Sequence, residues 1–211
     1  MIIPIGLQCT VGAFKREFEN SETLPFDWMF AHPKFVYEML VLLLEKNIEI
    51  SELVRAHFFN CSKYTKFMSC EHHVTCDTIE IPYNTIYDVI FPHDVCNEET
   101  VAKYIRRFER LKILILRSSE KLNFVYISQS SNGACNFTID GRCVVNNVYE
   151  NLNKINELIG RFRNNYKVFV FDTLQEENTE LLNPNICLVK LEARDNWSAL
   201  MPQLRNYRYF F

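Results

Sequence analysis

The sequence contains few glycines and lacks the loops that bind nucleotide phosphates. Only 5 of its 211 residues are glycine, so few positions can require a positive φ. It has neither a Gly-x-Gly-x-x-Gly fingerprint nor a Walker loop, so we expect no dinucleotide site and no P-loop site. Internal repeats, low-complexity segments and linker-like stretches are also absent. These absences favour a single domain over residues 1–211.

Strong charge and long apolar runs are missing as well. The formal net charge is only -3, which gives no reason to expect nucleic acid or a membrane surface as a partner. The most apolar stretch, residues 35–44, is too short to span a bilayer. The first residues lack the basic region and apolar core of a secretory signal, which favours a cytoplasmic protein. In that setting the eight cysteines are expected to be reduced thiols.

What is present is an alternation of strand-like and helix-like segments. Residues 122–128, 167–171 and 186–191 have the apolar pattern of strands, and residues 147–163 have that of an amphipathic helix. Strand, helix and strand at this spacing predict a right-handed crossover and parallel pairing. Other segments have weaker patterns: helices are predicted over 10–18, 34–46, 51–56 and 99–116, and strands over 2–5, 78–81 and 85–91.

These segments predict an α/β protein with a central, partly parallel sheet flanked by helices. Residues 47–98 are less regular and are interpreted as an elaboration of the first half. Within this region the two predicted strands would form a hairpin around Pro82, Tyr83 and Asn84.

The first candidate for chemistry is the thiol of Cys9, which follows the opening strand and Gly6. Backbone N–H groups at the start of a helix have no intrahelical partner, and the helix dipole there favours negative charge. A thiolate at such a position is stabilised, and the same N–H groups can bind an oxyanion. The alternative interpretation is that Cys9 packs as a small apolar residue.

A nucleophilic cysteine needs a base, and His93 is the best placed of the five histidines because it follows a predicted strand and Pro92. Asp27 is the preferred group to orient the imidazole, since neighbouring residues such as His93 and Asp94 point opposite ways on an extended chain. Asp27 could equally anchor its own loop. Oxyanion or substrate binding is assigned to Gln8, Trp28 and Asp94.

Two further clusters have alternative interpretations. Soft and borderline zinc ligands gather at Cys61, Cys70, His72, His73 and Cys76, but their spacing matches no usual zinc signature, and a loop with reduced thiols is favoured. Basic residues recur at helical spacing on one predicted helix face, which is interpreted first as solvated and second as a site for an anion or partner: Lys103, Arg106, Arg107 and Arg110.

Four motifs together resemble one family, which is described as papain-like cysteine peptidases and is found in bacteria and large DNA viruses. The motifs are Gly6-x-x-Cys9, Leu24-Pro25-Phe26-Asp27-Trp28, Phe91-Pro92-His93-Asp94 and Tyr104-x-Arg106-Arg107-Phe108. The resemblance covers about residues 3 to 130. It implies that Cys9 is a nucleophile, that His93 is its base and that Asp27 is a further polar residue of the site. If the protein is viral, the compartment would be the host cytoplasm.

The sequence departs from papain-like proteases in two respects. Those proteases carry a glutamine several residues before the cysteine, whereas Gln8 precedes Cys9 directly. Their sheets are largely antiparallel, whereas strand and helix alternate in the second half of this chain. We therefore predict a cysteine-dependent hydrolase or acyl transferase that needs no cofactor and acts on a protein or peptide. The rival hypotheses are a non-catalytic module that binds a host protein, and a zinc-stabilised binding domain.

Overall fold

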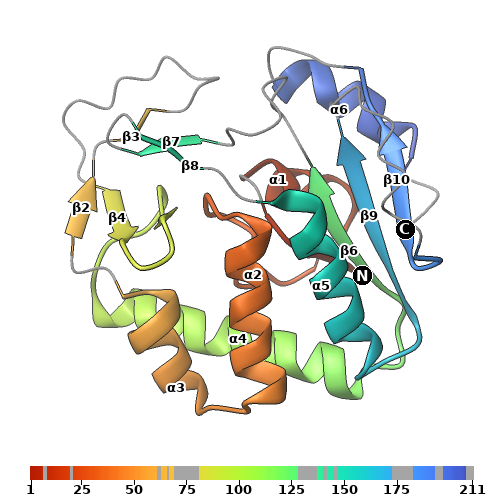
Figure 1. The fold of residues 1–211 in the computed structure, drawn as a ribbon. Coiled ribbons are helices and arrows are strands. Elements are labelled where there is room, and N and C mark those ends of the chain that lie inside the picture. The colour runs from red at the N-terminus through yellow and green to blue at the C-terminus, as the bar shows by residue number, and fades with distance from the viewer. Residues whose placement is uncertain are drawn as a thin grey trace.

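A computed structural model describes residues 1–6, 9–19, 21–60, 63–65, 67–68, 81–127, 137–139, 142–144, 147–172, 183–192 and 197–207. Its centre is a parallel sheet of four strands in the order β1 (Ile2–Pro4), β6 (Leu122–Ile127), β9 (Tyr166–Asp172) and β10 (Ile186–Lys190). Figure 1 shows β6, β9 and β10 side by side. The predicted α/β class with a parallel sheet is confirmed.

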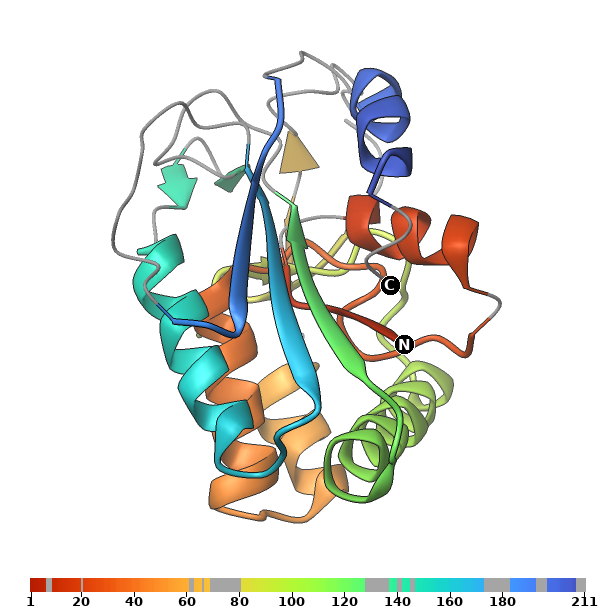
Figure 2. The same cartoon turned by 90° about the vertical axis from the view of Figure 1, so that its right-hand side faces the viewer.

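Helices cover both faces of this sheet, which explains why β6 is buried along its whole length. On one face, Ile2, Val125 and Phe169 pack with residues of α1 (Cys9–Phe18) and α6 (Trp197–Arg205). On the other, Ile3, Phe124 and Val168 pack with residues of α2 (Pro33–Leu40), α4 (Glu98–Arg117) and α5 (Val148–Gly160). In Figure 2, α2 and α5 lie on one side of the strands, and α1 and α6 lie on the other.

Most predicted helices occur close to their expected bounds. The longest is α4, in which the Asn97 side chain accepts the Thr100 N–H at 2.8 Å and caps the first turn. Two helices continue as π-helical turns: α2 into η1 (Val41–Glu45), and α3 (Ile50–Glu52) into η2 (Leu53–Phe58). Helix α6, which contains Pro202, was not predicted from the sequence. None of the helices in the described ranges is long and apolar enough to cross a membrane.

Smaller antiparallel sheets stand beside the central one. One contains β2 (Lys63–Thr65), β4 (Ile81–Asn84) and β5 (Val89–Ile90), and the other contains β3 (Phe67–Met68), β7 (Phe137–Ile139) and β8 (Arg142–Val144).

The predicted turn of the hairpin was wrong, because Pro82, Tyr83 and Asn84 belong to strand β4 and the chain turns over residues 85–88. Asn84 makes this turn: its side-chain oxygen accepts the Ile86 N–H at 3.0 Å, and its amide nitrogen donates to the carbonyls of His57 and Phe58.

A short bridge joins two segments that are 60 residues apart. Phe30 and Ile90 exchange backbone hydrogen bonds of 3.0 and 3.2 Å as an isolated antiparallel pair. Because antiparallel partners run past each other in opposite directions, the residues just before Phe30 lie beside those just after Ile90. The bridge therefore brings the loop of Trp28 next to the segment of His93.

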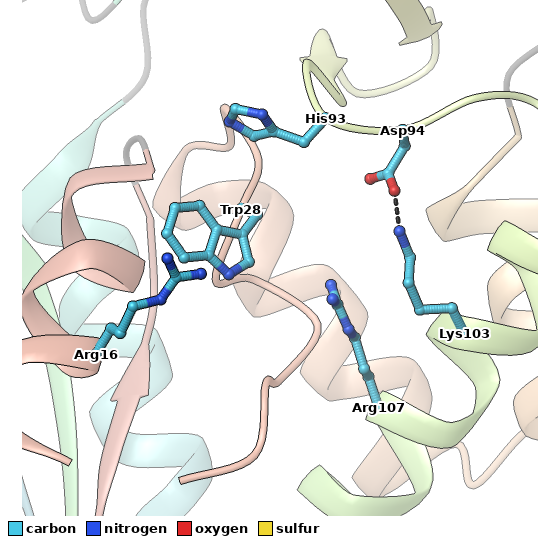
Figure 3. Close-up of a pocket in the computed structure, with 6 residues that line it drawn as sticks. All are labelled: Arg16, Trp28, His93, Asp94, Lys103 and Arg107. Carbon is cyan, nitrogen blue, oxygen red and sulfur yellow. Dashed lines mark hydrogen bonds and ion pairs between the residues drawn. The ribbon is translucent and has the colours of Figure 1, made fainter. Parts of the chain in front are cut away.

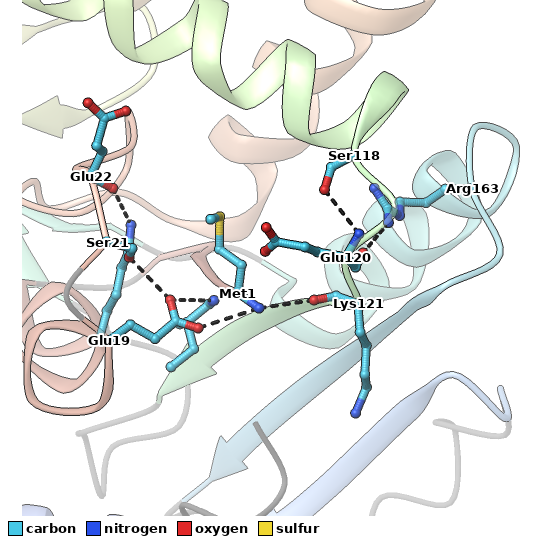
Figure 4. A network of polar contacts seen from close by, with 10 residues as sticks. Met1, Glu19, Ser21, Glu22, Ser118, Glu120, Lys121 and Arg163 are labelled. Atoms are coloured by element: carbon cyan, nitrogen blue, oxygen red, sulfur yellow. Dashed lines mark hydrogen bonds and ion pairs between the residues drawn. The ribbon is translucent and has the colours of Figure 1, made fainter.

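The amino end of the chain is held by a polar network, drawn in Figure 4. The amino group of Met1 donates to the Lys121 carbonyl at 3.0 Å and lies 3.4 Å from the Glu19 carboxylate. Glu19 also accepts the Ile2 N–H at 2.9 Å. Since Glu19 directly follows α1, the network ties the end of this helix to the start of β1 and β6, and it fixes both ends of the segment that carries Cys9.

Candidate functional site

The turn from β1 to α1 depends on Gly6. Its φ is +110°, a region that residues with a Cβ rarely adopt, and a Cβ there would lie 3.1 Å from the Ala31 carbonyl oxygen. Cys9 is the first residue of α1, as the sequence predicted. Gln8 and the side chain of Cys9 lie outside what the structure describes, so the oxyanion role of Gln8 and the distance from Cys9 to His93 stay predictions.

Helix α1 lies directly against the loop of residues 24–28. A Cβ built on Gly12 would come within 2.0 Å of the Asp27 carbonyl oxygen, so the helix and the loop touch backbone to backbone. Gly12 was not among the residues predicted to shape the site. In a chain with five glycines, its place inside a predicted helix, where glycine is unfavourable, was the available signal.

Asp27 is buried beneath this contact, with 2% of its surface exposed. Its Oδ2 accepts the Leu24 N–H at 3.0 Å and lies 3.3 Å from Lys15 Nζ, which is equally buried. Burial raises the pKa of the Asp27 carboxyl above its ordinary value, and the Lys15 ammonium opposes this shift.

Oδ1 of Asp27 has no hydrogen-bond partner among the described residues. The structure therefore does not bring Asp27 into hydrogen-bond contact with His93. Its observed contacts are those of the alternative interpretation, an aspartate that anchors its own loop.

His93 lies in a turn rather than at the end of a rigid strand. Strand β5 ends at Ile90, and the Asp94 N–H donates to the Phe91 carbonyl at 3.2 Å. The expectation that His93 and Asp94 point in opposite directions was wrong, because the chain is not extended at these residues. The turn lets both residues line one pocket. The His93 ring meets Trp28 edge to face, with 5.9 Å between ring centroids.

This pocket has a volume of about 310 Å³ and combines residues from four segments of the chain. Figure 3 shows the side chains that converge on it: Arg16 from α1, Trp28 from the loop, His93 and Asp94 from the turn, and Lys103 and Arg107 from α4. Three of the six predicted site residues, Trp28, His93 and Asp94, thus meet in one place. Its volume is within the range of small-molecule sites.

The pocket is lined by three permanent cations and one carboxylate. The side chain of Asp94 is almost fully buried, forms an ion pair with Lys103 and accepts the Tyr104 hydroxyl at 2.5 Å. Asp94 therefore neutralises Lys103. The Arg16 guanidinium lies 4.5 Å from the centroid of the Trp28 ring, a cation–π contact.

Arg107 was expected on the solvated face of its helix, and that expectation was wrong. It is 8% exposed and stacks on Tyr104, with 5.2 Å from its guanidinium carbon to the ring centroid. The buried stripe of α4 passes through Tyr104 and Leu111, and position 107 lies three and four residues from them, on the same side of the helix. That spacing was the signal for its burial. Its Nε and Nη1 have no hydrogen-bond partner in the described part of the chain.

The residues of the hypothetical zinc site are not described by the structure. Cys61, Cys70, His72, His73 and Cys76 all lie outside the described residues. Within the described ranges, no three or more side chains of histidine, cysteine, aspartate or glutamate gather as they would around a metal ion.

Comparison with known proteins gives one match. No curated protein and no solved structure is significantly similar to the chain. A family model described as "Putative papain-like cysteine peptidase" matches residues 1–160. These residues include strand β1, helix α1 and every residue that lines the pocket. The match covers well over half of the chain, and the protein therefore belongs to the family that carries this description.

Proposed function

We propose that the protein is a cysteine-dependent hydrolase or acyl transferase, with Cys9 as the nucleophile and His93 as the base. The observation that carries this proposal is that α1 begins at Cys9 and also supplies Arg16 to the pocket of His93. Residues seven apart share one face of a helix, about 10.5 Å apart along its axis. The face of α1 that borders the pocket is therefore the face on which Cys9 lies.

The position of Cys9 also suits a reactive thiol. It follows β1 at the carboxyl end of a parallel strand, where α/β proteins commonly bind their ligands. It begins a helix of 10 residues whose first turn contains no acidic residue. The dipole of such a helix stabilises a thiolate at its first position.

In the proposed reaction, the Cys9 thiolate attacks the carbonyl carbon of a peptide or related amide. Backbone N–H groups near Gln8 and Cys9 bind the oxyanion that forms. His93, holding the proton taken from the thiol, gives it to the leaving nitrogen as the carbon–nitrogen bond breaks. Water then cleaves the thioester with His93 as base, or another nucleophile accepts the acyl group. Both routes return the thiol.

In this proposal Asp27 does not orient the imidazole, as the aspartate of a catalytic triad would. Its contacts with Lys15 and Leu24 join α1 to the loop that carries Trp28. It would act as a positioning residue that sets the distance between the helix of Cys9 and the turn of His93. An Asp27→Asn variant that alters the pH dependence of Cys9 alkylation, and not only its rate, would support direct action on the imidazole instead.

The test is the rate at which iodoacetamide alkylates each cysteine, read by peptide mass spectrometry between pH 5 and 9. We expect Cys9 to react at least tenfold faster near pH 7 than the median of the other seven thiols, and His93→Ala to remove that advantage. His57→Ala is the matched control, because His57 does not line the pocket. A Cys9 thiol no more reactive than the others would refute the enzyme and favour the non-catalytic binding module.

A further inference from the structure

The pocket beside His93 holds an arginine whose charge is incompletely paired. Arg107 is more than nine-tenths buried, lines the pocket, and has two guanidinium nitrogens without a hydrogen-bond partner among the described residues. Buried charged donors are normally satisfied, because leaving one unpaired forfeits the hydration it had in the unfolded chain. A buried guanidinium with unsatisfied donors, in a side chain that lines a cavity, is therefore expected where a ligand in that cavity pairs with its charge.

The neighbouring charges also favour a ligand that pairs with Arg107. Asp94 pairs with Lys103 and Tyr104, and Asp27 pairs with Lys15, so both nearby carboxylates already have partners of their own. Asp27 is close enough to Arg107 for mutual attraction, but no hydrogen bond joins them. Arg16 contributes a second cation, whose contact in the described structure is with the Trp28 ring. Two guanidinium groups thus remain for an incoming anion.

We infer that this pocket binds a carboxylate group, and that the substrate of the proposed reaction is anionic close to the bond that is cleaved. Guanidinium groups match the geometry of carboxylate and phosphate oxygens, and their attraction for an anion is strong in a partly buried site. Asp94 is already paired with Lys103, so the two arginines would attract either anion. The proposed reaction acts on a peptide or related amide, whose own anionic group is a carboxylate, and this favours the carboxylate. Calling this ligand a substrate rests on the proposed function; the anion site itself does not.

The experiment measures binding rather than turnover. Isothermal titration of the full chain at constant ionic strength compares N-acetylglycine, N-acetylglycinamide and inorganic phosphate. The first two ligands differ only in the carboxylate. We expect N-acetylglycine to bind at least tenfold more tightly than the amide and more tightly than phosphate. Equal binding of acid and amide, no binding of the acid, or a preference for phosphate would overturn the inference.

Variants locate the site. Arg107→Gln should weaken N-acetylglycine binding at least tenfold, and Arg16→Gln, a change on the exposed side of α1, should weaken it severalfold. Arg106→Gln is the matched control, since it removes the same charge from the next, exposed position of α4 and should leave binding unchanged. An equal loss in Arg106→Gln would show that only bulk charge attracts the ligand. If Arg107→Gln does not fold, Arg16→Gln decides, and unchanged binding there would overturn the inference.

The carboxylate site and the cysteine-dependent enzyme can be refuted independently of each other. Carboxylate binding that depends on Arg107, together with an unreactive Cys9, would leave the anion site standing and refute the enzyme. A hyper-reactive Cys9 in a protein that binds no N-acetylglycine would leave the enzyme standing and refute an anionic substrate. If both stand, saturating N-acetylglycine should slow the alkylation of Cys9, because the bound ligand would occupy the pocket on the same face of α1.

Discussion

Gly12 and Asp27 meet so closely that no side chain fits between them: a Cβ on Gly12 would lie 2.0 Å from the Asp27 carbonyl oxygen. Both partners in this contact belong to the backbone, so neither can move aside as a side chain would. The contact sets the distance between the helix that begins at Cys9 and the loop that carries Trp28. It therefore links the geometry of the candidate nucleophile to that of the pocket.

Gly12→Ala should destabilise the protein by at least about 2 kcal/mol, because the added methyl must push α1 away from the loop. The free energy of unfolding in urea measures this change. Gly160→Ala is a suitable control, since the atoms nearest to a Cβ there belong to the Tyr166 side chain, with its hydroxyl at 2.9 Å, and the loss of stability should be smaller. Equal losses at the two positions would contradict the backbone contact as the cause.

The stability of the protein should also report the buried carboxyl of Asp27. Burial raises its pKa above the ordinary value of 3.8, so the folded protein binds this proton more tightly than the unfolded chain. The resulting stabilisation is complete below pH 3.8 and is lost as the pH rises through the pKa of the folded state. Asparagine cannot titrate. The stability advantage of the wild type over Asp27→Asn should therefore shrink as the pH rises from 3 to 7, measured by urea unfolding.

Glu49 provides a control of opposite sign for this measurement. Its pKa is lowered below 4.5, chiefly because it accepts the Ser51 hydroxyl, so its contribution is present at neutral pH and is lost in acid. The gap between wild type and Glu49→Gln should accordingly shrink as the pH falls. If the gap for Asp27→Asn followed the same direction as that for Glu49→Gln, attraction to Lys15 would outweigh the burial of Asp27.

Asn84 supports the hairpin from which the His93 turn begins. Its side chain is fully buried and makes three hydrogen bonds to backbone groups, including those of Phe58 and Ile86. Asn84→Ala should cost about 2–3 kcal/mol, because buried backbone groups lose their partners. Asn60→Ala removes a single exposed hydrogen bond to the Ala56 carbonyl and should change the unfolding free energy in urea by no more than about 0.5 kcal/mol. Similar losses in the two variants would argue against a structural role for Asn84.

The sequence predicted the parts of the fold that local patterns determine. Strands β6, β9 and β10 are largely apolar, and α4 and α5 have clear helical periodicity, so the existence of these elements and the parallel pairing of the strands could be predicted. The start of α1 at Cys9 was also predictable, because a glycine and a change of pattern mark it. These features depend on neighbours along the chain.

The features that were missed depend on contacts between distant segments. Arg107 is buried on the side of α4 that packs against the loop of Phe26 and Trp28, where Phe108 meets Phe26 edge to face. Its spacing from Tyr104 and Leu111 indicated that side of the helix, but a basic residue gives no sign that a distant loop covers it. The bridge between Phe30 and Ile90, which joins the loop to the His93 turn, leaves no local pattern in either segment. The turn was predicted too early in the chain, because Asn84 is a common turn residue. In the structure Asn84 ends strand β4, and its side chain supports the turn that follows at 85–88.

Gly6 offers the sharpest link between backbone conformation and the proposed chemistry. Alanine at a φ of +110° is strained, and its Cβ would also press on the Ala31 carbonyl, so Gly6→Ala should cost about 1–3 kcal/mol. The strain would be relieved by rotating the turn that leads into α1, which moves the first residue of the helix. We therefore expect Cys9 alkylation near pH 7 to slow toward the rate of an ordinary thiol, while the rate at Cys187 in β10 stays the same. A destabilised protein whose Cys9 remains as reactive as in the wild type would show that reactivity does not depend on this turn.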